Sequence, residues 1–178
     1  DYVIEFETEA EESRYAYYYL RDYSISTDPE TEASVGVSYN RNYADQMSEA
    51  VFEVYQFTSE SAFETALSES FNQSWRRYFS PADIVDTDDL IHVGDFDAVF
   101  DEDADYGSES LSMPETLDEG IYFAKVLVGD QELPLFIQSS TLSATIVDAD
   151  NQSLAWVHDL ETGESVSGAQ VEGISNET

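Results

Sequence analysis

The most informative part of the sequence is Gly120-Ile-Tyr-Phe-Ala-Lys-Val126, together with Ala155-Trp-Val-His-Asp-Leu-Glu-Thr-Gly-Glu-Ser-Val-Ser-Gly-Ala-Gln-Val171 downstream of it. The first stretch predicts a short strand, and the second predicts two strands, 154–158 and 166–171, joined as a hairpin. Gly163 can supply the positive φ that the turn of this hairpin needs. The last third of the chain therefore predicts β-structure with tight connections.

Short predicted strands also fill the chain upstream. Branched and aromatic residues that alternate or cluster in short runs favour strands, and turn signals recur about every 8 to 12 residues. This spacing is typical of antiparallel β-sandwiches, so the fold class we expect is mainly β. The expected strands are 2–6, 15–20, 35–39, 51–57, 96–100, 111–113, 121–128, 133–137 and 142–147.

One segment has the period of a helix instead. Ser61-Ala-Phe-Glu64 has the form of a capping box, in which the serine oxygen accepts a bond from a free N–H and the glutamate reaches back. We expect one inserted amphipathic helix over residues 61–79, ended near Pro81. Its apolar stripe is expected in the core rather than at a ligand site. The stripe consists of Phe63, Leu67, Phe71, Trp75 and Tyr78 or Phe79.

The chain is strongly acidic. Its 178 residues carry 39 Asp plus Glu against 6 Lys plus Arg, for a net charge of -33, and Lys125 is its only lysine. Hydrophobic residues make up 42%, which is enough for a packed core, so the charge does not indicate disorder. Because the screening length falls to about 3 Å at 1 M salt, the composition indicates a protein from a salty habitat. The alternative is an acidic surface that attracts cations or basic partners. Nucleic acid is not indicated, since it needs a basic footprint.

The composition also excludes several kinds of site. The chain has no cysteine, so disulfides, thiol catalysis and cysteine-ligated metals are excluded. No apolar run approaches the roughly 20 residues of a membrane helix. No signal-peptide pattern follows Asp1, where the chain opens in what reads as a strand, so we expect a piece of a longer polypeptide.

An acidic loop is the candidate metal site. Asp101, Asp103 and Asp105 place carboxylates at alternate positions, as at the start of a calcium-binding loop. The glycine that follows comes one place late, and Ser112 stands where a bidentate glutamate is needed. A solvated acidic loop is therefore the simpler interpretation, and no cofactor other than Ca²⁺ is suggested. A weaker cluster of the same kind is Asp86, Asp88 and Asp89.

Catalytic chemistry is not indicated. His92 and His158 are the only histidines, and the sequence names no partner for either. Paired carboxylates arise by chance among 39 acids, and a glycoside hydrolase also needs a shaped cleft and one acid of raised pKa. We therefore expect no enzyme activity and no catalytic residue.

One modification site is suggested by the sequence. Asn151 opens an Asn-x-Ser sequon in a predicted turn, which makes it the candidate acceptor for glycosylation. Two further sequons begin at Asn72, on the predicted helix, and at Asn176.

The quoted stretches resemble the bacterial alpha-2-macroglobulin family. Residues 120–126 are similar to the family's P-G-x-Y-x-V strand, which opens the last hairpin of a macroglobulin domain. Residues 142–171 are similar to the junction that follows it, L-x-W-V-x-D-L-x-T-G-x-P-V-x-G-A-x-V. Residues 52–57 are similar to the strand that leads into a Phe-containing helix. The residues that fit the junction are Trp156, Val157, Asp159, Leu160, Thr162, Gly163, Val166, Gly168, Ala169 and Val171.

The chain also departs from the family's motifs. Asp118 and Glu119 precede Gly120, where the family has proline, and Ser165 stands where proline is common. The family's reactive thioester lies in a separate domain and needs a cysteine, so it has no counterpart in this chain. The resemblance therefore concerns scaffold domains rather than the thioester.

The resemblance implies a domain organisation and a role. It implies terminal strands of a preceding macroglobulin-like domain at 1–28, a complete domain with the helix at 29–140, and the first strands of a following domain at 141–178. The implied function is a scaffold segment of a protease trap, extracellular or in the cell envelope. Its partners would be other domains of the same polypeptide and a captured protease. The alternative is a β-sandwich module of a cell-surface adhesin or surface-layer protein, and a calcium-dependent binding module is a third class.

Overall fold

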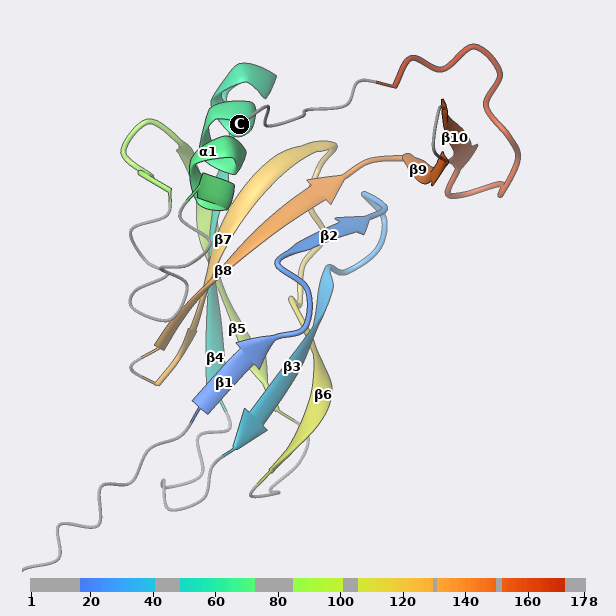
Figure 1. The fold of residues 1–178 in the computed structure, drawn as a ribbon. Coiled ribbons are helices and arrows are strands. Elements are labelled where there is room, and N and C mark those ends of the chain that lie inside the picture. Colours follow the sequence, from blue (N-terminus) through green and yellow to red (C-terminus); the bar gives the residue numbers. More distant parts are fainter. Residues whose placement is uncertain are drawn as a thin grey trace, which may run out of the picture.

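Two β-sheets packed face to face form the body of the protein (Figure 1). The computed structural model describes residues 17–40, 49–72, 85–100, 106–129, 131–149 and 152–171. A two-stranded hairpin stands apart from the two sheets, and a helix lies over one of them. This is the mainly β sandwich with an inserted helix that the sequence predicts.

The smaller sheet has the strand order β1-β3-β6 and is antiparallel throughout. Buried and exposed residues alternate along its strands, because successive side chains of a strand point to opposite faces. One face of this sheet is therefore in the core and the other in solvent. The strands are β1 (Tyr17–Leu20), β3 (Ser34–Asn40) and β6 (Tyr106–Ser112).

The larger sheet has the strand order β2-β8-β7-β4-β5. Its pairings are antiparallel except that β2 runs parallel to β8. The hairpin of β7 and β8 contains residues 120–126, the stretch that predicts a strand. The strands are β2 (Ser24–Thr27), β4 (Glu49–Gln56), β5 (Ile91–Val99), β7 (Gly120–Val128) and β8 (Gln131–Ser139).

The main core fills the space between the two sheets. Val37 and Leu111 reach into it from the smaller sheet, and Val54, Val126 and Leu135 from the larger one. All five side chains are at most 1% exposed. Burying an aliphatic side chain of this kind stabilises the fold by about 1.5–3 kcal/mol, so this layer is the main force that holds the two sheets together.

The helix α1 (Glu60–Asn72) packs on the outer face of the larger sheet. The Ala62 N–H donates to Ser59 Oγ at 3.2 Å, so the N-cap is Ser59 and the predicted capping box at Ser61 is wrong. Residues 73–79 of the predicted helix lie outside the described part of the chain. The described residues include no helix with the length and hydropathy needed to cross a membrane.

A second apolar layer lies between α1 and the sheet. Phe57, Phe123 and Phe136 come from the sheet side and Phe63 from the helix, and the Phe63 and Phe136 rings are 6.0 Å apart at 70°. Phe123 is fully buried here and lies 5.5 Å from Phe136. The apolar side of the helix is therefore a core element, as the sequence predicts for Phe63 and Leu67.

The strands β1 and β2 are shared between the two sheets of this sandwich. β1 pairs with β3, while β2 pairs with β8. The resemblance implies that a preceding domain ends at residue 28. In the structure residues 28–31 form a turn, in which the Thr31 N–H donates to the Asp28 carbonyl at 2.9 Å. Residues 17–27 therefore lie in the same sheets as the strands that follow them.

The hairpin consists of β9 (Leu142–Ala149) and β10 (Gln152–Asp159), paired antiparallel. After β10 the chain turns, and Gly163 has a φ of 69° as predicted. The predicted strand over 166–171 is not formed. Ser165 makes an isolated bridge with His158, and the Val166 N–H donates to the Val157 carbonyl at 2.9 Å. The partner of β10 is therefore β9 rather than the segment downstream.

Candidate functional site

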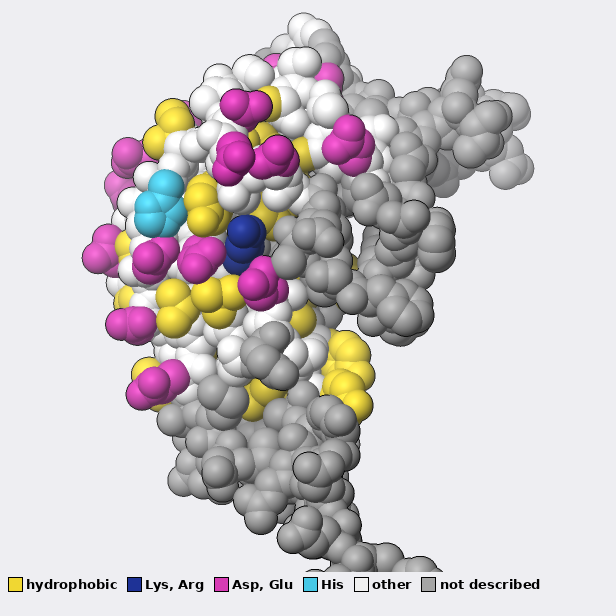
Figure 2. Space-filling view, turned by 90° about the vertical axis from the view of Figure 1, so that its left-hand side faces the viewer, with side chains coloured by type: hydrophobic (Ala, Val, Ile, Leu, Met, Phe, Trp, Pro, Cys, Tyr) yellow, Lys and Arg dark blue, Asp and Glu magenta, His cyan; other side chains and the backbone are white. Residues whose placement is uncertain are grey.

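The outer face of the larger sheet gathers charged, aromatic and histidine side chains. Strand pairing sets Glu53 opposite both Asp95 and Lys125. Figure 2 shows carboxylates and apolar side chains interspersed over this side of the molecule. We call this surface the acidic face, and define it by Glu49, Val51, Glu53, Tyr55, His92, Asp95, Asp97, Val99, Lys125, Leu127 and Glu132.

A β-bulge places His92 and Asp95 on the same face. On a regular strand, residues three apart point to opposite faces. The register shifts here, because Tyr55 pairs with His92 while Val54 pairs with Gly94, so one extra residue is inserted in β5. His92 Nε2 consequently lies 2.8 Å from Asp95 Oδ1. The bulge thus creates a histidine–carboxylate pair.

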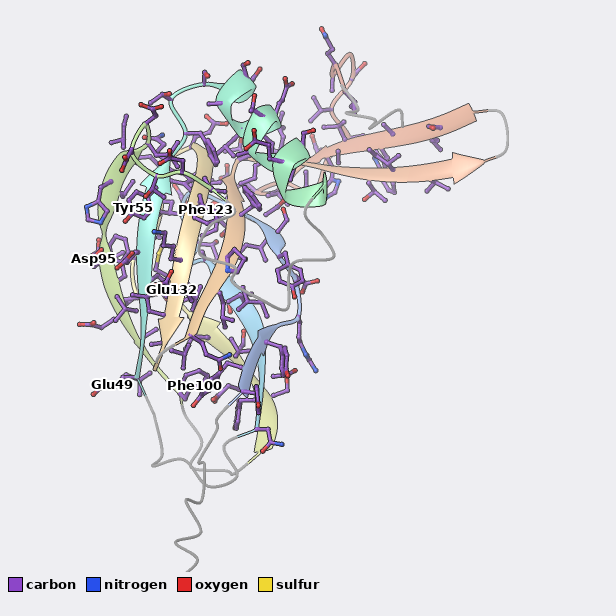
Figure 3. The ribbon with its side chains drawn as sticks, turned by 60° about the vertical axis from the view of Figure 1, so that its left-hand side comes forward. Glu49, Tyr55, Asp95, Phe100, Phe123 and Glu132 are labelled. Carbon is purple, nitrogen blue, oxygen red and sulfur yellow. The ribbon has the colours of Figure 1, made fainter. Side chains whose placement is uncertain are left out.

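Tyr55 connects this pair to the neighbouring strands (Figure 3). Its ring lies 5.1 Å from the His92 ring, and Lys125 Nζ lies 5.7 Å from its centroid. Its hydroxyl donates to Glu53 Oε2 at 3.4 Å. Partial burial, and then the negative charge of Glu53, raise the pKa of the Tyr55 phenol above its ordinary value. This shift favours the neutral form of the phenol.

The exposure of this cluster decides what chemistry it supports. The side chains of His92 and Asp95 are 50% and 58% exposed, so water hydrates both. An exposed pair of this kind contributes about 0–1 kcal/mol to stability, even when the histidine is protonated. The pair is therefore a solvated part of the acidic face.

The metal candidates from the sequence are only partly covered by the structure. Asp101, Asp103 and Asp105 lie outside the described residues, as does Asn151. The Asp86 carboxylate, from the weaker cluster, accepts a bond from the Asp88 N–H at 3.0 Å and so closes a local turn. Within the described ranges, no group of three or more His, Asp or Glu side chains is arranged to hold a metal ion.

The hairpin carries a second set of polar and aromatic groups. Trp156 is 59% exposed, and its indole N–H donates to Ser165 Oγ at 2.9 Å. His158 lies on the same side of β10, with its ring 6.2 Å from the Trp156 ring. The Thr162 N–H and hydroxyl both donate to Asp159 Oδ1, at 2.7 and 2.9 Å, and hold the pKa of that carboxyl below its ordinary value. These contacts order the turn after β10, but they enclose no cleft.

The partner of His92 could not be found from the sequence pattern. A histidine three residues before an aspartate reads as two residues on opposite faces of a strand, and only the bulge reverses that. A signal was present in Gly94, because a glycine inside a strand pattern often marks a bulge. Cross-strand neighbours such as Tyr55 follow only once the register is known.

Comparison with known proteins gives matches at the level of structure. No family model matches the sequence, and none of the curated proteins matches it either. A solved structure of native alpha-2-macroglobulin from Escherichia coli, spanning domains NIE-MG1, matches with a TM-score of 0.56 and 13% identity. That alignment covers 85% of this chain and 73% of the other. A second structure of the Escherichia coli protein, spanning MG0-NIE-MG1, matches with a TM-score of 0.50 and 12% identity, over 85% of this chain and 47% of the other.

Because the sequence identities are only 13% and 12%, these matches concern the fold alone. The architecture is that of bacterial alpha-2-macroglobulin domains, which confirms for the fold the resemblance stated from the sequence. Both matching structures span more than one named domain.

Proposed function

We propose that this chain, which has the fold of bacterial alpha-2-macroglobulin domains, is a non-enzymatic scaffold segment of a protease trap of that kind. The observation that supports the proposal is the two-sheet sandwich itself, held by an apolar layer on each side of the larger sheet. Such a body would move as a unit. A trap needs rigid modules of this kind, because closure around a protease is a movement of domains against one another.

The hairpin of β9 and β10 supports a further part of this proposal, which concerns the domain organisation of the chain. Ile146 is 53% exposed on one side of the ribbon, while Leu154 and Trp156 are 67% and 59% exposed on the other. A lone two-stranded hairpin is marginal in water, and apolar residues on both faces make it more so. Residues 141–178 would therefore be the first strands of a following macroglobulin-like domain, whose other strands cover them.

The charge of the chain supports a proposal about the medium in which the trap works. Carboxylates outnumber the single cation on the acidic face, and the whole chain carries -33. Concentrated salt shortens the range of this repulsion to a few ångströms. The protein would therefore come from a salt-adapted microbe and act outside the cytoplasm, at or beyond the cell envelope.

The trap proposal is tested on the full-length polypeptide in concentrated salt. After incubation with a salt-tolerant protease, we expect cleavage of a large protein substrate to fall while cleavage of a small chromogenic peptide continues. A cage excludes the large substrate and admits the small one. A polypeptide pre-unfolded by heat is the control and should leave both activities unchanged. If the native polypeptide leaves both activities unchanged as well, or inhibits both equally, the trap proposal is wrong.

A further inference from the structure

Among the described residues, the outer face of the smaller sheet carries no carboxylate. Its outward-facing residues on β1, β3 and β6 are small or neutral, in a chain where 39 of 178 residues are acidic. We call this surface the serine face. It consists of Tyr17, Tyr19, Ser34, Gly36, Ser38, Asn40, Ser108, Ser110 and Ser112.

The hydroxyls of the serine face bond to one another across the strands. Ser34 pairs with Ser110, Ser112 donates to Ser34 at 3.3 Å, and Ser38 donates to Ser108 at 3.3 Å. Removing water costs less free energy for polar groups that already have hydrogen-bond partners than for unpaired ones. Covering the paired serines of β3 and β6 therefore costs little.

An arginine and two tyrosines lie at one side of this face. Tyr17 and Tyr19 are 48% and 56% exposed along β1. The stem of Arg21 crosses Gly36, where a Cβ would sit 2.6 Å from Arg21 Cδ, so the glycine leaves room for it on the sheet. Tyrosine and arginine are enriched at protein interfaces, while Asp and Glu are depleted there. In its two tyrosines, its arginine and its lack of Asp and Glu the serine face resembles an interface, whereas its serines, which are depleted at interfaces, do not.

The opposite side of the sandwich provides the comparison. The acidic face exposes Glu49, Asp95, Asp97 and Glu132 to solvent. Another acidic surface that approached it would meet like charges, which costs several kcal/mol in a desolvated contact. The same approach to the serine face meets no carboxylate among the described outward-facing residues of β1, β3 and β6, and finds Arg21. Of these two faces, the serine face is therefore the one that an acidic partner can approach more closely.

We propose that the serine face is the docking surface for another acidic domain of the same polypeptide. The inference rests on the multi-domain part of the proposed function and not on protease capture. Strands of four, seven and seven residues span roughly 300 Å² of sheet. A free dimer usually needs about 800 Å² per partner, whereas a tethered neighbour gains a high effective concentration from the chain. Interfaces between domains of one chain are also the more polar kind.

Single cysteines test the proposal, because this chain has none of its own. Ser108→Cys reports on the serine face, and Val99→Cys reports on the acidic face, where Val99 is 64% exposed. Each is placed in the full-length polypeptide, with any cysteines outside this chain replaced, and labelled with a maleimide in concentrated salt. We expect Ser108→Cys to react at least about ten-fold more slowly than Val99→Cys, since labelling then waits for the interface to open. Equal rates in a polypeptide with a native circular dichroism spectrum would overturn the proposal.

A second test inserts a negative charge into the serine face. Adding Ser38→Glu to the Ser108→Cys polypeptide should bring its labelling rate up to that of Val99→Cys, because the new carboxylate repels the acidic domain. Adding Gln138→Glu, an equal charge on the exposed outer side of β8, should leave the slow rate unchanged. Protection that grows with protein concentration would identify a second copy as the occupant and overturn the proposal. Protease capture does not enter this assay, so it can fail or succeed separately.

Discussion

Dilution to about 10 mM salt, where the screening length reaches roughly 30 Å, is expected to unfold the protein. A net charge of -33 then repels across the whole molecule. Glu53 and Asp95 face each other directly across β4 and β5, a cross-strand arrangement that is destabilising for like charges. The repulsion needs to exceed only the net stability of a folded domain, about 5–15 kcal/mol. Far-ultraviolet circular dichroism during dialysis from molar salt measures the loss.

The control separates screening from specific ion binding. Sodium, potassium and calcium chlorides at equal ionic strength should protect the fold equally if screening is the cause. The double variant Glu53→Gln/Asp95→Asn should unfold at a lower salt concentration than the parent, because it removes one facing pair. A spectrum unchanged at about 10 mM salt would contradict the proposed adaptation to salt.

Phe123→Ala should destabilise the fold by about 3–5 kcal/mol, the usual cost of a buried phenylalanine. Phe123 is fully buried on β7, and Phe136 lies 5.5 Å from it in the layer under α1. The substitution leaves a cavity where the phenyl ring was. The neighbouring side chains cannot collapse into it, because they also hold α1 against the sheet. For a chain of this size the loss corresponds to a fall in Tm of roughly 6–20 °C. Thermal unfolding in concentrated salt measures it.

Tyr19→Ala is the matched aromatic control for this substitution. Tyr19 is 56% exposed, and exposed substitutions usually change stability by less than about 0.5 kcal/mol. We expect its Tm in the isolated chain to stay within about 2 °C of the parent. If Phe123→Ala behaved like Tyr19→Ala, the layer beneath α1 would not be a core.

The sandwich could be predicted from residue patterns because buried residues recur along the sequence with the period of the strand or helix that holds them. In β3, Val35, Val37 and Tyr39 are buried while the residues between them face outward. The helical stripe was recognisable for the same reason, since Phe63 and Leu67 fall on one side of α1. These features are local, so a single sequence carries them.

The remaining features depend on contacts between distant residues. β2 is four residues long, and its parallel pairing with β8 fixes it as a strand. The His92–Asp95 pair needs the bulge opposite Val54 and Tyr55. The serine face exists only after β1, β3 and β6 are brought together in register. No local pattern contains such pairings, so neither the acidic face nor the serine face could be assembled from the sequence.

In the proposed organisation, one finished sandwich braces a second one, which β9 and β10 begin. Amide hydrogen exchange in concentrated salt tests it, first on the isolated chain and then on the full-length polypeptide. In the isolated chain, we expect β3, β4, β7 and β8 to exchange slowly and β9 and β10 at least about 100-fold faster, because local opening of an uncovered hairpin is cheap. In the full polypeptide the hairpin should become as protected as the sandwich. A hairpin that is as slow as the sandwich on its own, or that stays fast in the full polypeptide, would contradict the account.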